Sequence, residues 1–306
     1  MFRDILVPLD GSRFAESALA LASRIARVSK ARMHLVLAHQ PHPALTGAGE
    51  ALVPPVNLFA ELQEFDRIYL EKTAERLHTG HRVTAEIHRV EGPAGPAICE
   101  EATRLDADLV VMATHGRGAF KRFWLGSVAD YLIRHLTTPV LLVHPGARQR
   151  GRPVRPIRGI LVALDLSRDS EQILEPAIAL ARATGAELTL INVVELVIQA
   201  GHIPEGMPIL ADEEFLKEAR MEAARRLDRL ARELSEQGLT VTTRVVSGQG
   251  AAGALLAALE ATEYDLLALT THGHGGMRRL LLGSVADKVI RGAAKPVLVL
   301  HPLTSG

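Results

Sequence analysis

A long internal repeat is the feature that most constrains how this chain folds. THGRGAFKRFWLGSVAD (114–130) recurs as THGHGGMRRLLLGSVAD (271–287), with 11 identical residues in 17 positions. ILVPLD (5–10) recurs as ILVALD (160–165) at nearly the same offset. A period of about 150 residues is far longer than a solenoid unit and has the size of a whole domain. The chain is therefore predicted to contain two copies of one domain.

We place the copies at residues 1–146 and 158–306, joined by the basic, proline-rich segment 147–157. This composition is typical of a stiff, exposed linker. The segment is short and has no aromatic residue for stacking on bases, which argues against nucleic-acid binding. Over the whole chain, Lys+Arg and Asp+Glu balance at 35 each, so nothing favours a nucleic-acid or membrane surface.

The bulk composition fits a soluble protein. A chain of 306 residues with 47% hydrophobic content can bury two ordinary cores. The N-terminus lacks the apolar stretch of a signal peptide, and no apolar run reaches the ~20 residues of a membrane span. We therefore expect a cytoplasmic protein. Cys99, the only cysteine, excludes an intrachain disulfide and a cysteine-based zinc cluster, and its small apolar neighbours indicate a buried residue rather than a nucleophile.

Apolar runs alternate with helical periodicity in both halves, which predicts an α/β fold. In the first half, strands are expected at 4–9, 33–39, 81–90, 108–113 and 139–144, with helices at 14–29, at 58–78 and from about Gly126. In the second half, strands are expected near 159–164, 188–194, 240–246, 265–270 and 296–301. Right-handed crossovers then give two tandem, doubly wound, five-stranded parallel sheets, flavodoxin-like or Rossmann-like, with strand order 3-2-1-4-5.

The most strongly repeated residues fall where such a sheet binds ligands, in the crevice between strands 1 and 4. Gly116 lets backbone N–H groups approach an anion, and Gly126 with Ser127 stands at a helix start, which favours phosphate. Asp10, after strand 1, suits the vicinal hydroxyls of a ribose. Together these residues indicate a nucleotide site.

A purely local explanation exists for each of these residues. The glycines can make a tight turn, and Asp10 can cap the first helix. Two matching copies of the whole set favour a ligand site, since turns alone tolerate Asn, Asp or Ser. A P-loop (G-x-x-x-x-G-K-[ST]) and an H-E-x-x-H motif are absent from the sequence. We accordingly predict no catalytic residue and no metal held by protein side chains.

Both halves resemble the universal stress protein family, over essentially the whole chain apart from the linker. The family's nucleotide motif, G-x2-G-x9-G-[ST], is matched in its latter part by Gly116 with Gly126-Ser127 and by Gly273 with Gly283-Ser284. The elements Asp10-Gly11-Ser12 and Asp165-Leu166-Ser167 resemble the family's first-strand element. The resemblance implies five parallel strands per copy and an adenine nucleotide, which many members bind.

We expect two sets of nucleotide-binding residues, most of them by position in the family. The first is Pro8, Asp10, Ser12, Ala38, Met112, Ala113, Gly116, Arg117, Gly126, Ser127 and Val128; the second is Ala163, Asp165, Val193, Leu269, Thr270, Gly273, His274, Gly283, Ser284 and Val285. Arg117 is included because its side chain can reach phosphates, although a solvated charge beside the helix explains it equally well. Ala38 and Val193 are expected to offer backbone groups to the adenine edge. The first glycine of the motif is Ala113 in one half and the bulkier, β-branched Thr270 in the other, so the N-terminal site matches the family better.

The expected function is an ATP-binding regulatory protein of the stress response, with Mg²⁺ held mainly by the phosphates. The alternatives are a slow ATPase or phosphotransferase, which would rely on positioning and a metal, and a nucleotide-free protein-interaction module. By the same resemblance, the last strands PVLLVH and PVLVLH pair the two halves about a pseudo-twofold axis within the chain, and two chains form a homodimer.

Overall fold

The apolar run that opens each copy forms the central strand of a parallel sheet. DILVPL becomes strand β1 (Asp4–Leu9), in which every residue is buried. GILVA becomes strand β6 (Gly159–Ala163), buried up to its last residue. Strands buried on both faces require covering helices on each side of the sheet, which the alternating sequence supplies. The first strand of each copy therefore lies in the middle of its own core.

This computed structural model describes residues 1–39, 56–114, 125–144, 156–195, 213–248, 250–272 and 282–303, with the side chains of 56–60 left out. The chain divides into two units, Met1–Val154 (unit 1) and Arg155–Gly306 (unit 2). No helix in these ranges combines the length and the apolar character that a membrane crossing requires.

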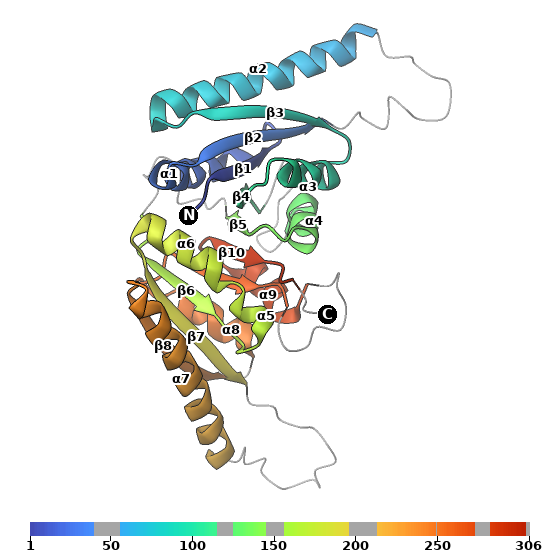
Figure 1. Cartoon of the computed structure of the whole chain (residues 1–306). Helices are drawn as coiled ribbons and strands as arrows, with labels where there is room; N and C mark the ends of the chain where they lie inside the picture. Colours follow the sequence, from blue (N-terminus) through green and yellow to red (C-terminus); the bar gives the residue numbers. More distant parts are fainter. Residues whose placement is uncertain are drawn as a thin grey trace, which may run out of the picture. The chain divides into compact units, whose positions relative to one another are not determined.

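Unit 1 has parallel strands in the order β3-β2-β1-β4-β5 (Figure 1). Its elements are β1, the 3₁₀ helix η1 (Ala15–Ala18), α1 (Leu19–Ser29), β2 (Arg32–His39), α2 (Val56–His81), β3 (Ala85–Glu91), α3 (Ala94–Arg104), β4 (Leu109–Ala113), α4 (Ser127–His135) and β5 (Val140–Val143). The predicted order 3-2-1-4-5 is confirmed for this unit.

Unit 2 repeats the order as β8-β7-β6-β9-β10. Its elements are β6, α5 (Arg168–Glu171), α6 (Leu174–Thr184), β7 (Glu187–Glu195), α7 (Glu213–Glu236), β8 (Val241–Gly248), α8 (Ala251–Leu259), β9 (Leu266–Thr270), α9 (Ser284–Gly292) and β10 (Val297–Leu300). The α/β class and the order are confirmed here as well, whereas the pairing of the units through their last strands stays a prediction.

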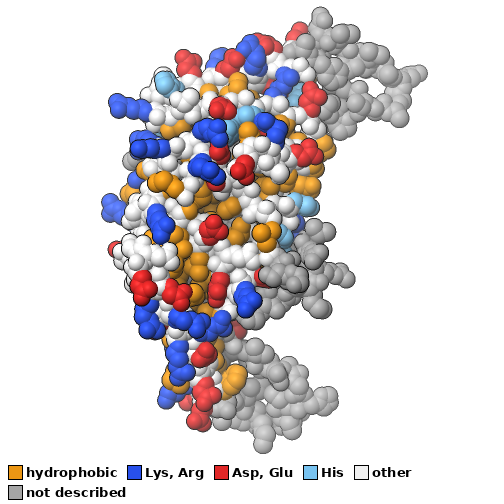
Figure 2. All heavy atoms as spheres, in the orientation of Figure 1, with side chains coloured by type: hydrophobic (Ala, Val, Ile, Leu, Met, Phe, Trp, Pro, Cys, Tyr) orange, Lys and Arg blue, Asp and Glu red, His pale blue; other side chains and the backbone are white. Residues whose placement is uncertain are grey.

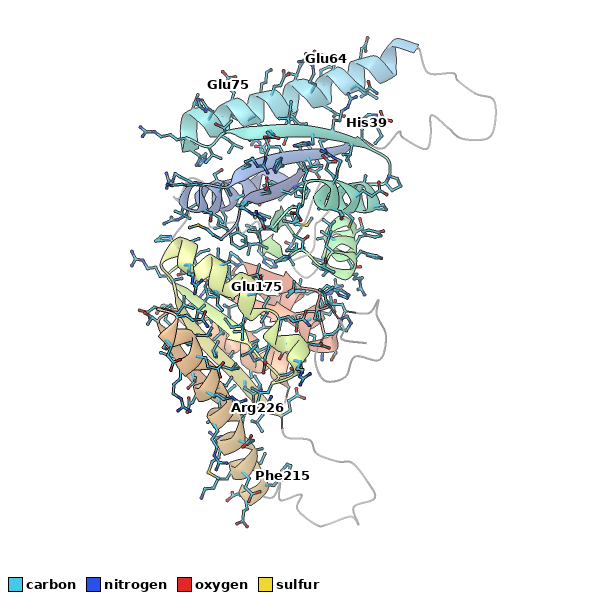
Figure 3. The ribbon with its side chains drawn as sticks, viewed as in Figure 1. His39, Glu64, Glu75, Glu175, Phe215 and Arg226 are labelled. Atoms are coloured by element: carbon cyan, nitrogen blue, oxygen red, sulfur yellow. The ribbon has the colours of Figure 1, made fainter. Side chains whose placement is uncertain are left out.

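Helices cover both faces of the unit 1 sheet. Neighbouring residues of a strand point to opposite faces. In β3, His88 contacts Glu101 of α3, with Nδ1 and Oε1 2.9 Å apart, whereas the next residue, Arg89, donates a hydrogen bond to the Gln63 carbonyl of α2. Helices α2 and α3 therefore lie on opposite faces. Figure 1 shows α2 running along β3, and Figure 3 shows Glu64 and Glu75 along the outer side of α2.

Two element boundaries differ from the sequence prediction. The third strand was expected at 81–90, but α2 continues to His81, and Arg82 then takes a positive φ of 55° that ends the helix, so β3 begins only at Ala85. The helix expected over 14–29 is instead the 3₁₀ turn η1 followed by α1. Ser12 Oγ accepts the N–H of Ala15 at 3.1 Å, which stabilises this tighter first turn.

The sheet face beneath α3 in unit 1 carries paired charges. Asp4 accepts a hydrogen bond from Arg32 Nη2 at 2.8 Å, and this bond holds the pKa of the Asp4 carboxyl below its usual range. Glu101 accepts a hydrogen bond from Arg104 Nη2 at 2.7 Å, which likewise lowers the pKa of Glu101. Burial lowers the pKa of His88, which lies against Glu101. Figure 2 shows acidic, basic and histidine side chains interspersed over the surface.

The loop before β9 is longer than its counterpart before β4. Residues 260–265 connect α8 to β9, whereas residues 105–108 connect α3 to β4. A Cβ added to Gly159 would overlap the Glu263 carbonyl oxygen of this longer loop. Lys295 Nζ donates to the carbonyls of Leu259, Ala261 and Tyr264 at 2.6–2.7 Å. One glycine and one lysine therefore accommodate the longer loop in unit 2.

Candidate functional site

The central strands part from their neighbours where the strand order reverses. In unit 1, β1 pairs with β2 through Leu9, but with β4 only at Ile5 and Leu6. Pro8 therefore lies beyond the β1–β4 ladder, where a residue without an N–H group forfeits no bond to β4. In unit 2, the β6–β9 ladder ends at Val162. The central strand thus separates from its neighbour at this edge of each sheet, which is where doubly wound folds have their ligand crevice.

The crevice of unit 2 is a cavity of about 610 Å³, within the ~300–1,000 Å³ of ordinary ligand pockets. Its walls contain eight residues of the second predicted set, namely Ala163, Asp165, Val193, Leu269, Thr270, Gly283, Ser284 and Val285. The structure thus brings together residues that are more than a hundred positions apart in the sequence. Gly273 and His274, the remaining two, lie outside the described residues.

One wall of this cavity is the beginning of α9. Gly283 is the N-cap, with an extended backbone, and its N–H donates to the Thr271 carbonyl at 2.9 Å. A Cβ on Gly283 would come within 2.8 Å of that same oxygen, so the close backbone approach requires glycine. The N–H groups of Ser284, Val285 and Ala286 have no partner within the helix, and these residues line the cavity. The positive end of the helix dipole therefore faces the cavity.

The aspartate after each central strand takes part in a local turn. Asp165 Oδ1 accepts the N–H of Ser167 at 3.0 Å and its hydroxyl at 2.6 Å. In the same way, Asp10 Oδ1 accepts the N–H of Ser12 at 2.9 Å. Each aspartate therefore stabilises its own turn, but Asp165 does not cap the next helix, because the N-cap there is Ser167, whose Oγ accepts the N–H of Ser170. Asp165 also lines the cavity, and its contact with a ribose stays a prediction.

The residue after each aspartate has a left-handed backbone. Gly11 has a φ of 78° and Leu166, at the matching position, a φ of 67°. This conformation favours glycine, and a leucine there is strained. Arg226, which Figure 3 shows on α7, donates from Nη2 to the Leu166 carbonyl at 2.5 Å and so helps to hold the turn.

Thr270 occupies the position of the first glycine of the family motif, and its β-branched side chain is bulkier than that glycine. Its hydroxyl is turned back onto the chain and donates to the His272 carbonyl at 2.7 Å. The neighbouring Thr271 hydroxyl lies 3.0 Å from Nδ1 of both His272 and His301. These bonds fix the end of β9 beside the cavity, which remains about 610 Å³ in volume. Whether the N-terminal site binds better stays a prediction.

Unit 1 places the described part of the first predicted set at the equivalent edge. The positions at strand ends are Pro8, Asp10, Ser12, Ala38, Met112 and Ala113, and those at the start of α4 are Gly126, Ser127 and Val128. Gly126 is the N-cap and donates to the Thr114 carbonyl at 2.8 Å, as Gly283 does to Thr271. Gly116 and Arg117 lie outside the described residues.

An acidic residue in the first turn of each of these helices is neutralised by an arginine. Asp130 pairs with Arg134 in α4, and Asp287 pairs with Arg291 in α9, each with a shortest contact of 2.8 Å. The pairing draws the carboxylate charge toward the next turn, which lowers its repulsion of an anion at the helix start.

Two further cavity residues were missed by the sequence analysis. Asn192 is buried, and its Nδ2 donates to the Leu164 carbonyl at 2.8 Å, just past the end of β6. Glu195 Oε1 accepts the N–H of Ala251 at 2.6 Å at the start of α8. Asn192 was detectable in principle, because it is a polar residue in an apolar strand, at the position that Leu37 occupies in the first copy.

Cys99 is half-buried on α3, and burial raises the pKa of its thiol to about 11. The thiol is therefore protonated near neutral pH. This environment agrees with the sequence-based interpretation that the cysteine is not a nucleophile.

Sequence comparison identifies the family. The model of the universal stress protein family matches residues 1–144 and again residues 156–301. The chain belongs to this family. A universal stress protein of Mycolicibacterium smegmatis is 29% identical over 97% of both chains, and one of Mycobacterium bovis is 27% identical over 97% of this chain and 99% of that protein. One of Thermus aquaticus is 30% identical over 47% of this chain and 99% of its own length.

Solved structures show the same fold. A universal stress protein from Archaeoglobus fulgidus superimposes with a TM-score of 0.68 at 20% identity, covering 97% of this chain and 98% of that one. A putative universal stress protein from Pseudomonas aeruginosa superimposes with a TM-score of 0.62 at 19% identity, covering 98% and 94%. The tandem arrangement of two such domains in one chain is thus shared with family members of the same length.

Proposed function

We propose that this universal stress protein is a regulatory protein that binds an adenine nucleotide, with ATP as the ligand and one site at the crevice of each unit. The observation that carries the proposal is the unit 2 cavity, whose walls combine the α9 N-terminus with the ends of three parallel strands. The N–H groups of Ser284, Val285 and Ala286 would hold phosphate oxygens, because they are helix-start donors without intrahelical partners.

The other end of the nucleotide would lie toward β6 and β7. The ladder between these strands ends at Ala163 and Ile191, so Val193 lies beyond it and offers backbone groups to the adenine. Asp165, at the mouth between the two ends, would accept the ribose hydroxyls. Mg²⁺ would be held mainly by the phosphates themselves. By the same reasoning, Gly126, Ser127 and Asp10 would serve the unit 1 site.

Nucleotide binding would act as a signal by stabilising the bound state. A ligand that binds only the folded chain shifts folding and loop equilibria by mass action, by about 2.7 kcal/mol at a hundredfold excess over Kd. Pairing of the two units through β5 and β10, and of two chains into a homodimer, is part of the same proposal. A bound nucleotide that favours or disfavours this pairing would regulate the assembly of the protein.

The first experiment releases and identifies nucleotides from chain purified without added ligand, followed by calorimetric titration with ATP and Mg²⁺. We expect up to two adenine nucleotides per chain. Gly283→Val should remove the unit 2 site, because its side chain overlaps the Thr271 carbonyl, and Gly126→Val should remove the unit 1 site. Asp165→Asn, at an exposed position, should weaken binding about tenfold, the loss of about one charge-assisted hydrogen bond.

Gly253→Ala is the matched control, because a Cβ there meets nothing within 4 Å. Circular dichroism and urea midpoints establish that each variant folds. Failure of wild-type chain to bind ATP would refute the proposal and favour an interaction module. Phosphate release in a single turnover would identify the slow ATPase instead.

A further inference from the structure

A second polar cluster lies in unit 1, away from the crevice, on the face of the sheet beneath α3. Strands β2 and β3 are parallel neighbours in which His34 pairs with Glu86, and Val36 with His88. The side chains of His34, Glu86 and His88 project to one face, because residues two apart in a strand share a face. His34 is 2% exposed, His88 15% and Glu86 58%.

Three side-chain atoms converge there at the spacing of metal ligands. His34 Nδ1 lies 3.0 Å from His88 Nε2 and 3.6 Å from Glu86 Oε2, and His88 Nε2 lies 3.9 Å from the same oxygen. Ligands about 2.0–2.1 Å from a tetrahedral Zn²⁺ are ~3.3 Å apart. A small movement of the exposed Glu86 brings its oxygen to that spacing from both nitrogens, and the two rings need to separate by only a few tenths of an ångström from 3.0 Å.

The hydrogen bonds of His34 Nε2 and His88 Nδ1 determine which nitrogen of each ring carries the hydrogen. His34 Nε2 lies 2.9 Å from Asp4 Oδ1, and His88 Nδ1 lies 2.9 Å from Glu101 Oε1. Both carboxylates are paired with arginines, and an ionised carboxylate can only accept a hydrogen bond. Each outer nitrogen therefore carries the hydrogen. In neutral rings, the two inner nitrogens then face each other as lone pairs 3.0 Å apart.

Two lone pairs at that distance repel unless a cation lies between them. A histidine that donates its remote N–H to a carboxylate is the usual arrangement at protein zinc sites, because the carboxylate orients the ring and makes it a stronger ligand. Here both histidines have such a partner. Arg104 Nη2 is 3.4 Å from His88 Nδ1 but 2.7 Å from Glu101 Oε1, so its hydrogen bond belongs to the carboxylate.

The charge of the cluster also favours a cation. Three carboxylates, Asp4, Glu86 and Glu101, are matched by the two guanidinium groups of Arg32 and Arg104, which leaves one negative charge. Imidazole nitrogens with one carboxylate suit Zn²⁺ and its first-row neighbours better than Mg²⁺ or Ca²⁺, which prefer oxygen ligands.

We propose that unit 1 binds one Zn²⁺ between His34 Nδ1, His88 Nε2 and Glu86 Oε2. The fourth position opens to solvent on the exposed side of Glu86. Unit 2 has no equivalent among its described residues, because the register places Thr189 and Thr242 where unit 1 has His34 and Glu86, and these threonine hydroxyls hydrogen-bond to each other at 2.9 Å. The expected stoichiometry is therefore one ion per chain.

The test uses the full chain, stripped with a chelator and kept free of nucleotide. Zn²⁺ is titrated at neutral pH against a chromophoric chelator, and Co²⁺ is added separately for its visible spectrum. Wild-type chain should bind one Zn²⁺, give the intense absorption of a tetrahedral Co²⁺ site and gain thermal stability with Zn²⁺. His88→Gln and Glu86→Gln should lower the affinity more than Glu101→Gln, for which about 10–100-fold is expected from an orienting carboxylate.

Two controls separate this site from others in the chain. Thr242→Val changes the unit 2 position that corresponds to Glu86. His78→Gln removes a histidine of α2, the helix on the opposite face of the sheet from α3. Both should bind Zn²⁺ within twofold of wild type. Glu86→Gln keeps the test independent of folding, since its side chain is mostly exposed.

Absence of Zn²⁺ and Co²⁺ binding by wild-type chain would overturn the proposal and leave a shared proton between the rings. Equal affinity in wild type, His88→Gln and Glu86→Gln would overturn it too, because the ion would then be bound elsewhere.

Discussion

The two units have similar residues at the carboxyl edge of their sheets but different residues on one face of the sheet. At the carboxyl edge, both have an aspartate after the central strand, a glycine N-cap bonded to a threonine carbonyl, and an Asp–Arg pair in the following helix. Beneath the first helix after β3 or β8, they differ: Asp4 and His34 of unit 1 correspond in register to Gly159 and Thr189 of unit 2. The two copies therefore keep the same turn and helix-start contacts at the carboxyl edge, whereas the residues on one face of the sheet differ.

The largest expected effect concerns Gly159, where unit 1 has Asp4. Gly159→Ala places a Cβ on the Glu263 carbonyl oxygen, so β6 and the loop must separate, at a cost of about 3 kcal/mol. Hydrogen exchange measured by mass spectrometry should show faster exchange in the β6 and β9 peptides than in those of β1. Gly253→Ala should change stability by less than about 1 kcal/mol, because that position has open space and is helical. Equal effects of the two substitutions would show that the loop yields freely.

Lys295 tests the same difference between the units, because its ammonium group holds the longer loop of unit 2. Lys295→Met removes a charged donor from three backbone carbonyls and should destabilise unit 2 by about 2 kcal/mol. Thr138 is the residue at this position in the first copy, so Thr138→Ala is the matched control, with an expected change below about 0.5 kcal/mol. Urea denaturation of the full chain measures both. A silent Lys295→Met would mean that water replaces the ammonium group.

A smaller, favourable effect is expected at Leu166. Leu166→Gly relieves a left-handed backbone strain of about 1–2 kcal/mol, but glycine also makes the unfolded chain more flexible, so the net gain should be about 0.5 kcal/mol. The reciprocal change, Gly11→Ala in unit 1, should destabilise by about 1 kcal/mol. Thermal midpoints of the two variants should therefore move in opposite directions. Movement in the same direction would refute strain as the main difference between the turns.

The smallest effect concerns the chemistry of a side chain rather than stability. Burial raises the pKa of Cys99 to about 11, so the thiolate fraction of the folded chain is small at pH 8 and rises only as the pH approaches 11. Alkylation by iodoacetamide should accordingly be slow at pH 8 and accelerate over the next three pH units. Urea-unfolded chain, whose thiol titrates near its ordinary pKa of about 8.5, is the control. Fast alkylation of folded chain at pH 8 would contradict this.

The strands and their order were predictable because most strands are separate apolar runs, the third alternates like a half-exposed strand, and both halves give the same order. The ends of α2 and β3 were not, since the alternating segment from His81 fits either a helix end or a strand, and the positive φ of Arg82 decides the boundary. Gly283 was predicted as a helix start, but its necessity comes from the Thr271 carbonyl, a contact that only the folded chain shows.

The cluster of His34, Glu86 and His88 was beyond sequence reasoning for a different reason. Its members lie on two strands separated by a long helix, and only the register of β2 with β3 places His34 beside Glu86. A shift of one residue would direct the side chains of one strand to the opposite face. Alternation of polar residues within each strand was visible, whereas the partner of each residue was not.

The loop at 260–265 also restricts which residue can replace Gly159 in unit 2. Its Glu263 carbonyl occupies the space into which a side chain at position 159 would project. A carboxylate at this position, such as Asp4 supplies in unit 1, would therefore require the loop to move away from β6. A point mutation at position 159 is thus costly in unit 2, although the matching position of unit 1 carries a side chain.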